Sequence, residues 1–311
     1  MIILLLHQGV RAAEAPVAIG ETRSVSSNEK ITLEVMRGEV VIRVGNDNTF
    51  RVSGTLDELA EGYELRSENG FTRFEVQMPR NVRGSVLRRA QESDLQITVP
   101  VNSSVEYSGV NAAVDIEGVA GGSRITTVNG DITASMLSGY IELRTVNGGI
   151  DSRANTGRME INTVNGEIQD EGSEGRISYD AVNGEIKINS AAEEISASVV
   201  NGSIRARLSG TRDLDIKSVN GGIDVALSNA RSPRISGSTV SGEIRLHLPR
   251  DVDARFSLQS NAGGRIINNI TDDEVVSARF GPARSLNFST GQGVGVVEMD
   301  SVSGRLELNI N

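Results

Sequence analysis

Hydrophobic and polar positions recur along the middle of the chain with a period of about eighteen residues. The tripeptide Val-Asn-Gly marks each period, and Val-Ser-Gly replaces it in two later copies. The full copies start at Val128, Val146, Val164, Val182, Val200 and Val219, and the altered copies start at Val240 and Val302. Degenerate copies of the tripeptide occur at 110–112 and 260–263. Repetition at a fixed period is typical of a stacked repeat protein.

An apolar column stands two residues after the glycine of each repeat. This core column contains Ile132, Ile150, Ile168, Ile186, Ile204, Ile223 and Ile244. Two further apolar columns lie two residues apart, as at Ile141 and Leu143, which is the alternation of a β-strand. A second glycine column begins at Gly139. Each repeat therefore predicts a strand, a turn, a second strand and a second turn.

A unit of this kind buries its apolar face only by stacking on similar units. The sequence therefore predicts an all-β fold, a single-stranded parallel β-helix or β-solenoid, with coils of about eighteen residues. Successive coils should lie ~4.8 Å apart, and a right-handed coil is favoured. Leucine-rich and hexapeptide repeats are rival solenoids. The first needs a consensus rich in Leu and the second a six-residue apolar period, and neither is visible.

The regular solenoid is predicted for residues 110–248. Residues 21–109 predict irregular β coils or a β-cap before it, and residues 249–311 predict irregular coils that close it. The strand pattern at 308–311 is expected to leave an open edge for end-to-end self-association. Residues 1–15 resemble a truncated signal peptide, because an apolar run is followed by Ala13-Glu14-Ala15. This pattern predicts export to the periplasm or the cell surface.

Composition narrows the classes of function. The 311 residues carry a net charge of −10, so nucleic acid is not an expected partner. The densest basic stretch, with Arg80, Arg83, Arg88 and Arg89, is interpreted as a solvated loop because acidic residues follow it. The chain has no Cys, which excludes disulfides and thiolate metal sites. No apolar run approaches the ~20 residues of a membrane-spanning segment.

The motifs together resemble a known bacterial family. They are Val-Asn-Gly-x-Ile at eighteen-residue spacing, Leu248-Pro249 leading into Val252-Asp253-Ala254, and the closing Ser301-Val302-Ser303-Gly304. They are similar to a family of adhesin-like domains of unknown function, over residues 21–311. The resemblance implies a β-solenoid associated with the cell envelope and supplies no catalytic residues. The coil length of bactofilins indicates a cytoskeletal polymer instead, but bactofilins lack the Val-Asn-Gly signature.

The asparagines of the signature are the first candidate site. They are Asn129, Asn147, Asn165, Asn183, Asn201 and Asn220. A row of amides could bind a sugar or an ion. The favoured interpretation is a structural Asn ladder, buried inside the turns, in which each amide bonds to the next coil. Asn also tolerates the left-handed conformation, and the glycine after it favours a tight turn.

Other candidate groups have solvated or structural interpretations. Acids follow the glycine at Asp131, Glu167, Glu185 and Glu243. Paired carboxylates could hydrolyse glycosides or hold calcium, but this position should point outwards. His247, the only His beyond residue 15, should face solvent and supports neither a metal site nor a Ser-His-Asp triad. The glycines from Gly291 to Gly295 lack the strand–loop–helix context of a nucleotide loop.

A short basic stripe is the remaining candidate. Arg158 and Arg176 share a position in adjacent coils, with Tyr140 one coil earlier. The stripe could contact an acidic polysaccharide. The nearby acids Glu160 and Glu174 favour self-neutralisation instead.

These features predict a non-enzymatic structural or interaction protein of the cell envelope or cell surface, adhesin-like in character. No catalytic, cofactor-binding or metal-binding residue and no cofactor is expected. The expected partner is an envelope protein or a polysaccharide. Two alternatives stay open. One is a self-assembling scaffold that stacks end to end, and the other is a polysaccharide-active β-helix enzyme, which rests on fold analogy alone.

Overall fold

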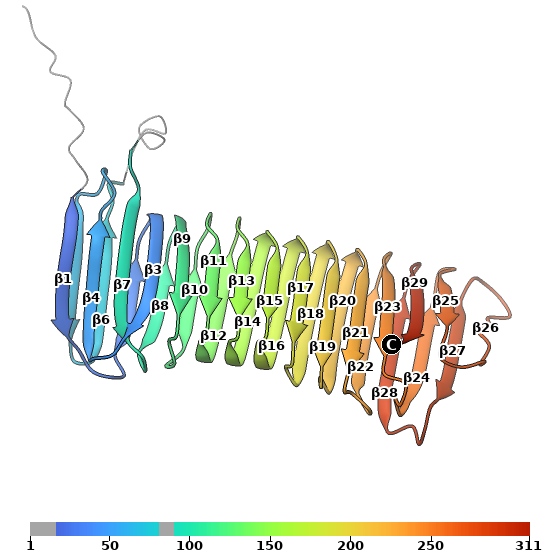
Figure 1. The fold of residues 1–311 in the computed structure, drawn as a ribbon. Helices are drawn as coiled ribbons and strands as arrows, with labels where there is room; N and C mark the ends of the chain where they lie inside the picture. The colour runs from blue at the N-terminus through green and yellow to red at the C-terminus, as the bar shows by residue number, and fades with distance from the viewer. Residues whose placement is uncertain (1–16, 81–89) are drawn as a thin grey trace, which may run out of the picture.

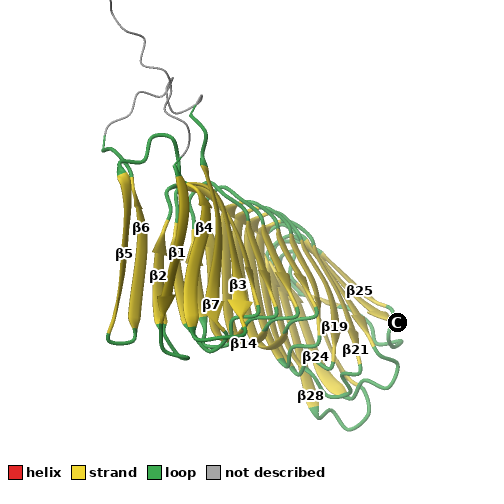
Figure 2. Cartoon of the chain, turned by 60° about the vertical axis from the view of Figure 1, so that its left-hand side comes forward, coloured by secondary structure: helices red, strands yellow, loops and turns green. Residues whose placement is uncertain are grey.

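The two halves of each repeat form two long sheets that face one another. A computed structural model describes residues 17–80 and 90–311, and every regular element in those residues is a β-strand. Sheet A has 14 strands and sheet B has 15. The coils stack along one axis (Figure 1), and their strands lie in two layers joined by loops at the strand ends (Figure 2). The prediction of an all-β solenoid is confirmed. The proposed signal peptide and most of the basic stretch, residues 81–89, lie outside the described residues.

Strands that are neighbours in space are mostly one repeat apart in the sequence. In spatial order, sheet A contains β1 (Ala18–Ser24), β4 (Thr49–Thr55), β7 (Ser93–Pro100), β3 (Arg37–Gly45), β9 (Asn111–Glu117), β11 (Ile132–Ser135), β13 (Ile150–Arg153), β15 (Ile168–Glu171), β17 (Ile186–Ser190), β19 (Ile204–Ser209), β21 (Ile223–Ser228), β23 (Glu243–Leu248), β29 (Arg305–Ile310) and β25 (Arg265–Asn268). Listed from the opposite end of the stack, sheet B contains β26 (Val276–Ser277), β27 (Arg284–Ser289), β24 (Ala254–Ser260), β28 (Gly295–Ser301), β22 (Arg234–Thr239), β20 (Asp213–Asn220), β18 (Glu194–Asn201), β16 (Glu174–Asn183), β14 (Thr156–Asn165), β12 (Ser138–Thr145), β10 (Ser123–Thr126), β8 (Ser104–Ser108), β2 (Lys30–Glu34), β6 (Phe71–Gln77) and β5 (Gly62–Glu68).

Neighbouring coils stand in register, with equivalent residues of successive repeats opposite one another. In sheet A, Ile132 pairs with Ile150 and Ile150 with Ile168, all in parallel strands. In sheet B, Ile141 pairs with Met159 in the same way. Every member of the core column is 2% exposed or less. The inward residues of both sheets therefore fill a narrow interior, and the alternate residues form two continuous outer faces.

The signature glycine is required by the close approach of two coils. A Cβ atom on Gly166 would overlap the backbone carbonyl oxygen of Gly148, one coil earlier. The φ angle of Gly166 is not in the left-handed region, and neither is that of Asn165. The expectation that a left-handed Asn-Gly turn fixes this corner is therefore wrong. The second glycine column does adopt that conformation, with φ of 92° at Gly139 and 127° at Gly157.

Both ends of the stack depart from sequence order. The coil made by β2 and β3 lies between the coil β8–β9 and the coil β6–β7. At the other end, the coil β28–β29 lies between β22–β23 and β24–β25 (Figure 1). The expectation that the last strand leaves an open edge is therefore wrong, because β29 is hydrogen-bonded on both sides. Antiparallel strands complete both ends: β4, β1 and β5 at one, and β27 and β26 at the other.

Candidate functional site

The asparagines of the signature form a hydrogen-bonded ladder along one edge of the stack. Each Nδ2 group donates to the Oδ1 atom one coil earlier, at 2.8 Å from Asn129 to Asn111, 2.7 Å from Asn147 to Asn129, 2.8 Å from Asn165 to Asn147, 2.8 Å from Asn183 to Asn165, 3.0 Å from Asn201 to Asn183 and 3.1 Å from Asn220 to Asn201. These side chains are exposed, not buried inside the turns as expected. The ladder links successive coils in contact with water, so each bond contributes less than a buried one.

The acids after the signature glycine also lie on the outside. Glu167 and Glu185 both form ion pairs with Lys187, and the pair of Glu167 with Lys187 measures 2.6 Å. Glu243 lies 3.2 Å from Arg305. These carboxylates belong to a network of surface ion pairs that runs from coil to coil. No group of three or more metal-ligating side chains occurs in residues 17–80 and 90–311.

The glycine-rich loop at 291–295 already holds an anion of the protein itself. Backbone N–H groups of Gln292 and Val294 donate to the carboxylate of Asp253, at 2.7 and 3.2 Å. These hydrogen bonds from Val294 and Gln292 hold the pKa of Asp253 below its ordinary value. The amides that would bind a phosphate in a nucleotide loop are therefore engaged within the chain. His247 lies on the outer face of sheet A with its Nε2 atom 3.8 Å from Asp224.

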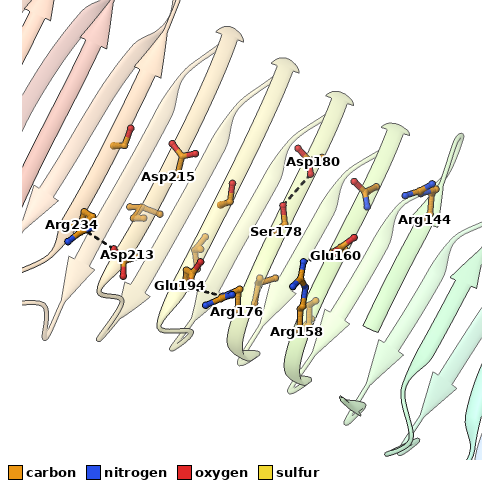
Figure 3. Close-up of a pocket in the computed structure, with 17 residues that line it drawn as sticks. Arg144, Arg158, Glu160, Arg176, Ser178, Asp180, Glu194, Asp213, Asp215 and Arg234 are labelled. Atoms are coloured by element: carbon orange, nitrogen blue, oxygen red, sulfur yellow. Dashed lines mark hydrogen bonds and ion pairs between the residues drawn. The ribbon is translucent and has the colours of Figure 1, made fainter. Parts of the chain in front are cut away.

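The outer face of sheet B carries a shallow hollow, which we call the trough. It has a volume of about 510 Å³ and is lined by outward side chains of six successive strands from β12 to β22. Figure 3 shows charged side chains of these coils on either side of a line of short ones. That line is the floor, formed by Ser178, Ser196, Asp215 and Ser236, which stand opposite one another in successive coils.

The trough exists because the floor changes from long to short side chains. Towards the N-terminal end the same row holds Arg124, Glu142 and Glu160. Arg124 and Glu142 are joined by a 2.8 Å hydrogen bond that holds the pKa of Glu142 below its ordinary value. From β16 onward the row holds mostly serines, so the face is lower than its flanks. This change was not predicted from the sequence, although the loss of long side chains in one outward column was the available signal.

The walls of the trough are largely ion-paired. Arg176 lies 2.7 Å from Glu194, across one coil, and Arg158 lies 3.3 Å from Glu160 on its own strand. Arg234 lies 3.6 Å from Asp213 (Figure 3). The basic stripe is therefore paired with acids, as the sequence suggested.

Glu160 is one of the two acids that the sequence indicated for that stripe. The partner of Arg176 is Glu194 in place of Glu174, because in a parallel sheet the residue opposite in the next coil is nearer than one further along the same strand.

A buried acid lies behind the trough, in the interior. Asp170 is 1% exposed and accepts hydrogen bonds from Ser152 and Ser173, both at 2.6 Å, and from Tyr179 at 2.9 Å. Burial raises the pKa of Asp170, and it also raises that of Tyr179 well above the ordinary value. This network was not foreseen, although an acid at a position that is Ile188 in the next coil was a usable signal.

The fold and its two outer faces define the class of this protein. It is a β-solenoid whose two sheets each present a polar outer surface. Within that class the chain belongs to the family Toastrack DUF4097, whose model matches residues 28–304. The resemblance drawn from the repeat is thereby confirmed. No curated protein matches the chain. The described residues contain no helix of the length and apolarity that a membrane span requires.

Two solved structures are similar to the chain. One is a candidate cell adhesion protein from Clostridium sporogenes, with 10% identity, a TM-score of 0.23, and coverage of 95% of this chain and 100% of that one. The other is a candidate adhesin from Bacteroides fragilis, with 12% identity, a TM-score of 0.30, and coverage of 94% of this chain and 98% of that one.

Proposed function

We propose that this protein is a non-enzymatic interaction module of the bacterial envelope, exported and adhesin-like, which acts by presenting a rigid surface. One observation carries the proposal. The outer face of sheet B is continuous over many coils and contains a trough lined by six strands, in whose walls Arg158, Arg176 and Arg234 form ion pairs with acids. A surface of this kind contacts an extended partner at many points, each of them weak. Binding at many points needs no group with a catalytic pKa.

The arrangement of acids favours binding over catalysis. Acid–base catalysis at a glycosidic bond needs two carboxyl groups that flank the bond in different environments. The acids beside the trough, such as Glu194 and Asp213, are instead spread along the walls and engaged by arginines. Asp170, an acid whose pKa is raised by burial, lies in the core and is turned away from solvent.

The proposal is tested with the full chain in its own cells and on isolated envelopes. A C-terminally tagged chain should appear in the periplasmic or surface fraction. The purified, labelled chain should bind intact envelopes saturably, and excess unlabelled chain should compete. A tagged chain found only in the cytoplasm would overturn the proposal. So would turnover of a polysaccharide that is abolished by changing a single acid.

A further inference from the structure

We infer that the trough on sheet B binds an extended, uncharged, hydroxyl-rich glycan that lies along the axis of the stack. The inference rests on the proposed function and names the ligand class of its main surface. It follows from the floor of the trough, the pairing of its walls and the aromatic side chain at its end.

The floor offers small hydroxyl groups in a line. Ser196 and Ser236 have no hydrogen-bond partner within the described part of the chain, and Ser178 donates only to Asp180, at 3.3 Å. A serine hydroxyl both donates and accepts, as a sugar hydroxyl does. Asp215, between Ser196 and Ser236, adds an acceptor. The floor can therefore exchange hydrogen bonds with several hydroxyls of one ligand.

The walls supply polar groups without net attraction for a charged ligand. The guanidinium of Arg176 faces Glu194 at 2.7 Å, and that of Arg158 faces Glu160 at 3.3 Å. An acidic glycan would have to displace these carboxylates to reach the arginines. A neutral glycan needs no displacement, because a paired guanidinium keeps spare N–H groups and a paired carboxylate keeps spare lone pairs. The pairing therefore selects against acidic ligands and is compatible with neutral ones.

An exposed aromatic ring stands at the N-terminal end of one wall. Tyr140 is 39% exposed and lies opposite Arg158, in the coil before it. Its hydroxyl is 3.5 Å from Glu142, the residue that precedes Glu160 in the outward row continuing into the floor of the trough. A tyrosine ring combines an apolar face with a polar tip. The apolar face of a pyranose ring can stack on it while the sugar hydroxyls reach the walls.

The length of the trough sets the length of the ligand. Six strands from β12 to β22 are five coil steps apart, which at ~4.8 Å per step gives about 24 Å. The length of a pyranose unit along an extended glycan is comparable to one coil step. We therefore expect affinity to rise with chain length up to five or six sugar units and then to level off.

The test uses calorimetric titration of the full chain with neutral hexasaccharides of glucose and of N-acetylglucosamine, and with hexagalacturonate as the acidic counterpart. A neutral hexasaccharide should bind, and raising the salt concentration should change its affinity less than twofold. Ser196→Arg places a long side chain on the floor and should weaken binding at least tenfold. Tyr140→Ala should weaken it about fivefold. The control Ser135→Arg places the same side chain on the outer face of sheet A and should leave the affinity unchanged.

The outcomes separate this inference from the proposed function. Binding of hexagalacturonate in preference to the neutral sugars would overturn the ligand class. Failure of every neutral hexasaccharide to bind, or equal binding by Ser196→Arg and Ser135→Arg when both melt like the parent, would overturn the trough as a glycan site. In each case, saturable binding to envelopes would still support the proposed function. Loss of envelope binding by the parent chain would overturn the function itself.

Discussion

Two adjacent glycines in the loop between β20 and β21 should respond in opposite ways to the same substitution. Gly221 is the signature glycine of its coil, and a Cβ atom there would overlap the carbonyl oxygen of Gly202. Gly222 follows it directly and has nothing within 4 Å of an added Cβ atom. Neither has a φ in the left-handed region. The pair therefore isolates the close approach of two coils from the flexibility of glycine.

The magnitudes follow from these surroundings. In Gly221→Ala the new methyl group meets backbone, which cannot rotate away, so two coils must separate locally. Overpacking of this kind should lower the free energy of unfolding by about 3 kcal/mol. In Gly222→Ala the methyl group points into open space and restricts only the unfolded chain. That substitution should raise the free energy of unfolding by about 0.4–1 kcal/mol.

Urea unfolding followed by far-ultraviolet circular dichroism measures both changes. The midpoint of Gly221→Ala should fall clearly below that of the parent, and the midpoint of Gly222→Ala should be equal or higher. The repeated pair Gly148 and Gly149 offers a second comparison, because Gly148 meets the carbonyl oxygen of Gly130 while Gly149 has only ordinary contacts. Equal loss of stability in Gly221→Ala and Gly222→Ala would refute the argument from coil spacing.

Three further substitutions test the interior and the ladder. Ile168→Ala removes a fully buried side chain from the core column and should cost ~2–5 kcal/mol in chemical unfolding; a loss below about 0.5 kcal/mol would contradict burial of the column. Asn165→Ala breaks two exposed ladder bonds, to Asn147 and from Asn183, and should cost only about 0.5–1 kcal/mol; a loss above about 3 kcal/mol would mean that the ladder is buried. Asp170→Asn should stabilise the protein at pH 7, because burial raises the pKa of Asp170 and the folded state therefore disfavours its ionised form. In the parent, the stability contributed by the protonated Asp170 carboxyl should be fully present below pH about 4, the pKa of Asp in the unfolded chain. It should be lost as the pH rises through the raised pKa of the folded state. The gain in melting temperature should therefore shrink at acidic pH, and a variant less stable than the parent at pH 7 would show that the ionised carboxylate is favoured by its three hydroxyl donors.

The interior of the stack could be predicted because a solenoid repeats one packing problem many times. Once Ile132, Ile150 and Ile168 occupy the same place in successive repeats, stacking brings them together whatever the details of the turns. Alternation along the strands then separates inward from outward positions. The same logic identified Arg158 and Arg176 as neighbours on one face.

The repeat pattern could not predict properties that depend on the exact path of the chain within one coil, such as solvent exposure at a corner or the distance between neighbouring backbones. The periodic pattern places Asn165 beside Asn147, but it does not say whether that corner is open to water. The distance between glycine backbones at the same corner, which excludes a Cβ atom on Gly166, depends on how sharply the chain bends there. The trough depends on differences between repeats, such as Ser178 in place of Glu160, and a consensus hides such differences.

The order of coils at the ends was also hidden by the repeat itself. The copy at Val302 was recognisable as a coil, but every coil offers the same ladder of hydrogen bonds. The pattern therefore cannot tell whether β28–β29 stacks outside β24–β25 or between that coil and β22–β23. In the structure, β28–β29 lies between β22–β23 and β24–β25. At the other end, β2–β3 likewise lies between two coils that come later in the sequence, β6–β7 and β8–β9.

The arrangement of the end strands affects whether another copy of the chain could add to either end of the stack. An exposed parallel edge invites another copy to add to it, and proteins discourage such addition with charges, short strands and antiparallel covers. In this chain β5 is an antiparallel outer strand with the charged residues Glu64, Arg66 and Glu68, and β25 has only four residues. The last strand, β29, is enclosed between two strands and offers no edge. End-to-end stacking would therefore have to begin from edges that are charged or short.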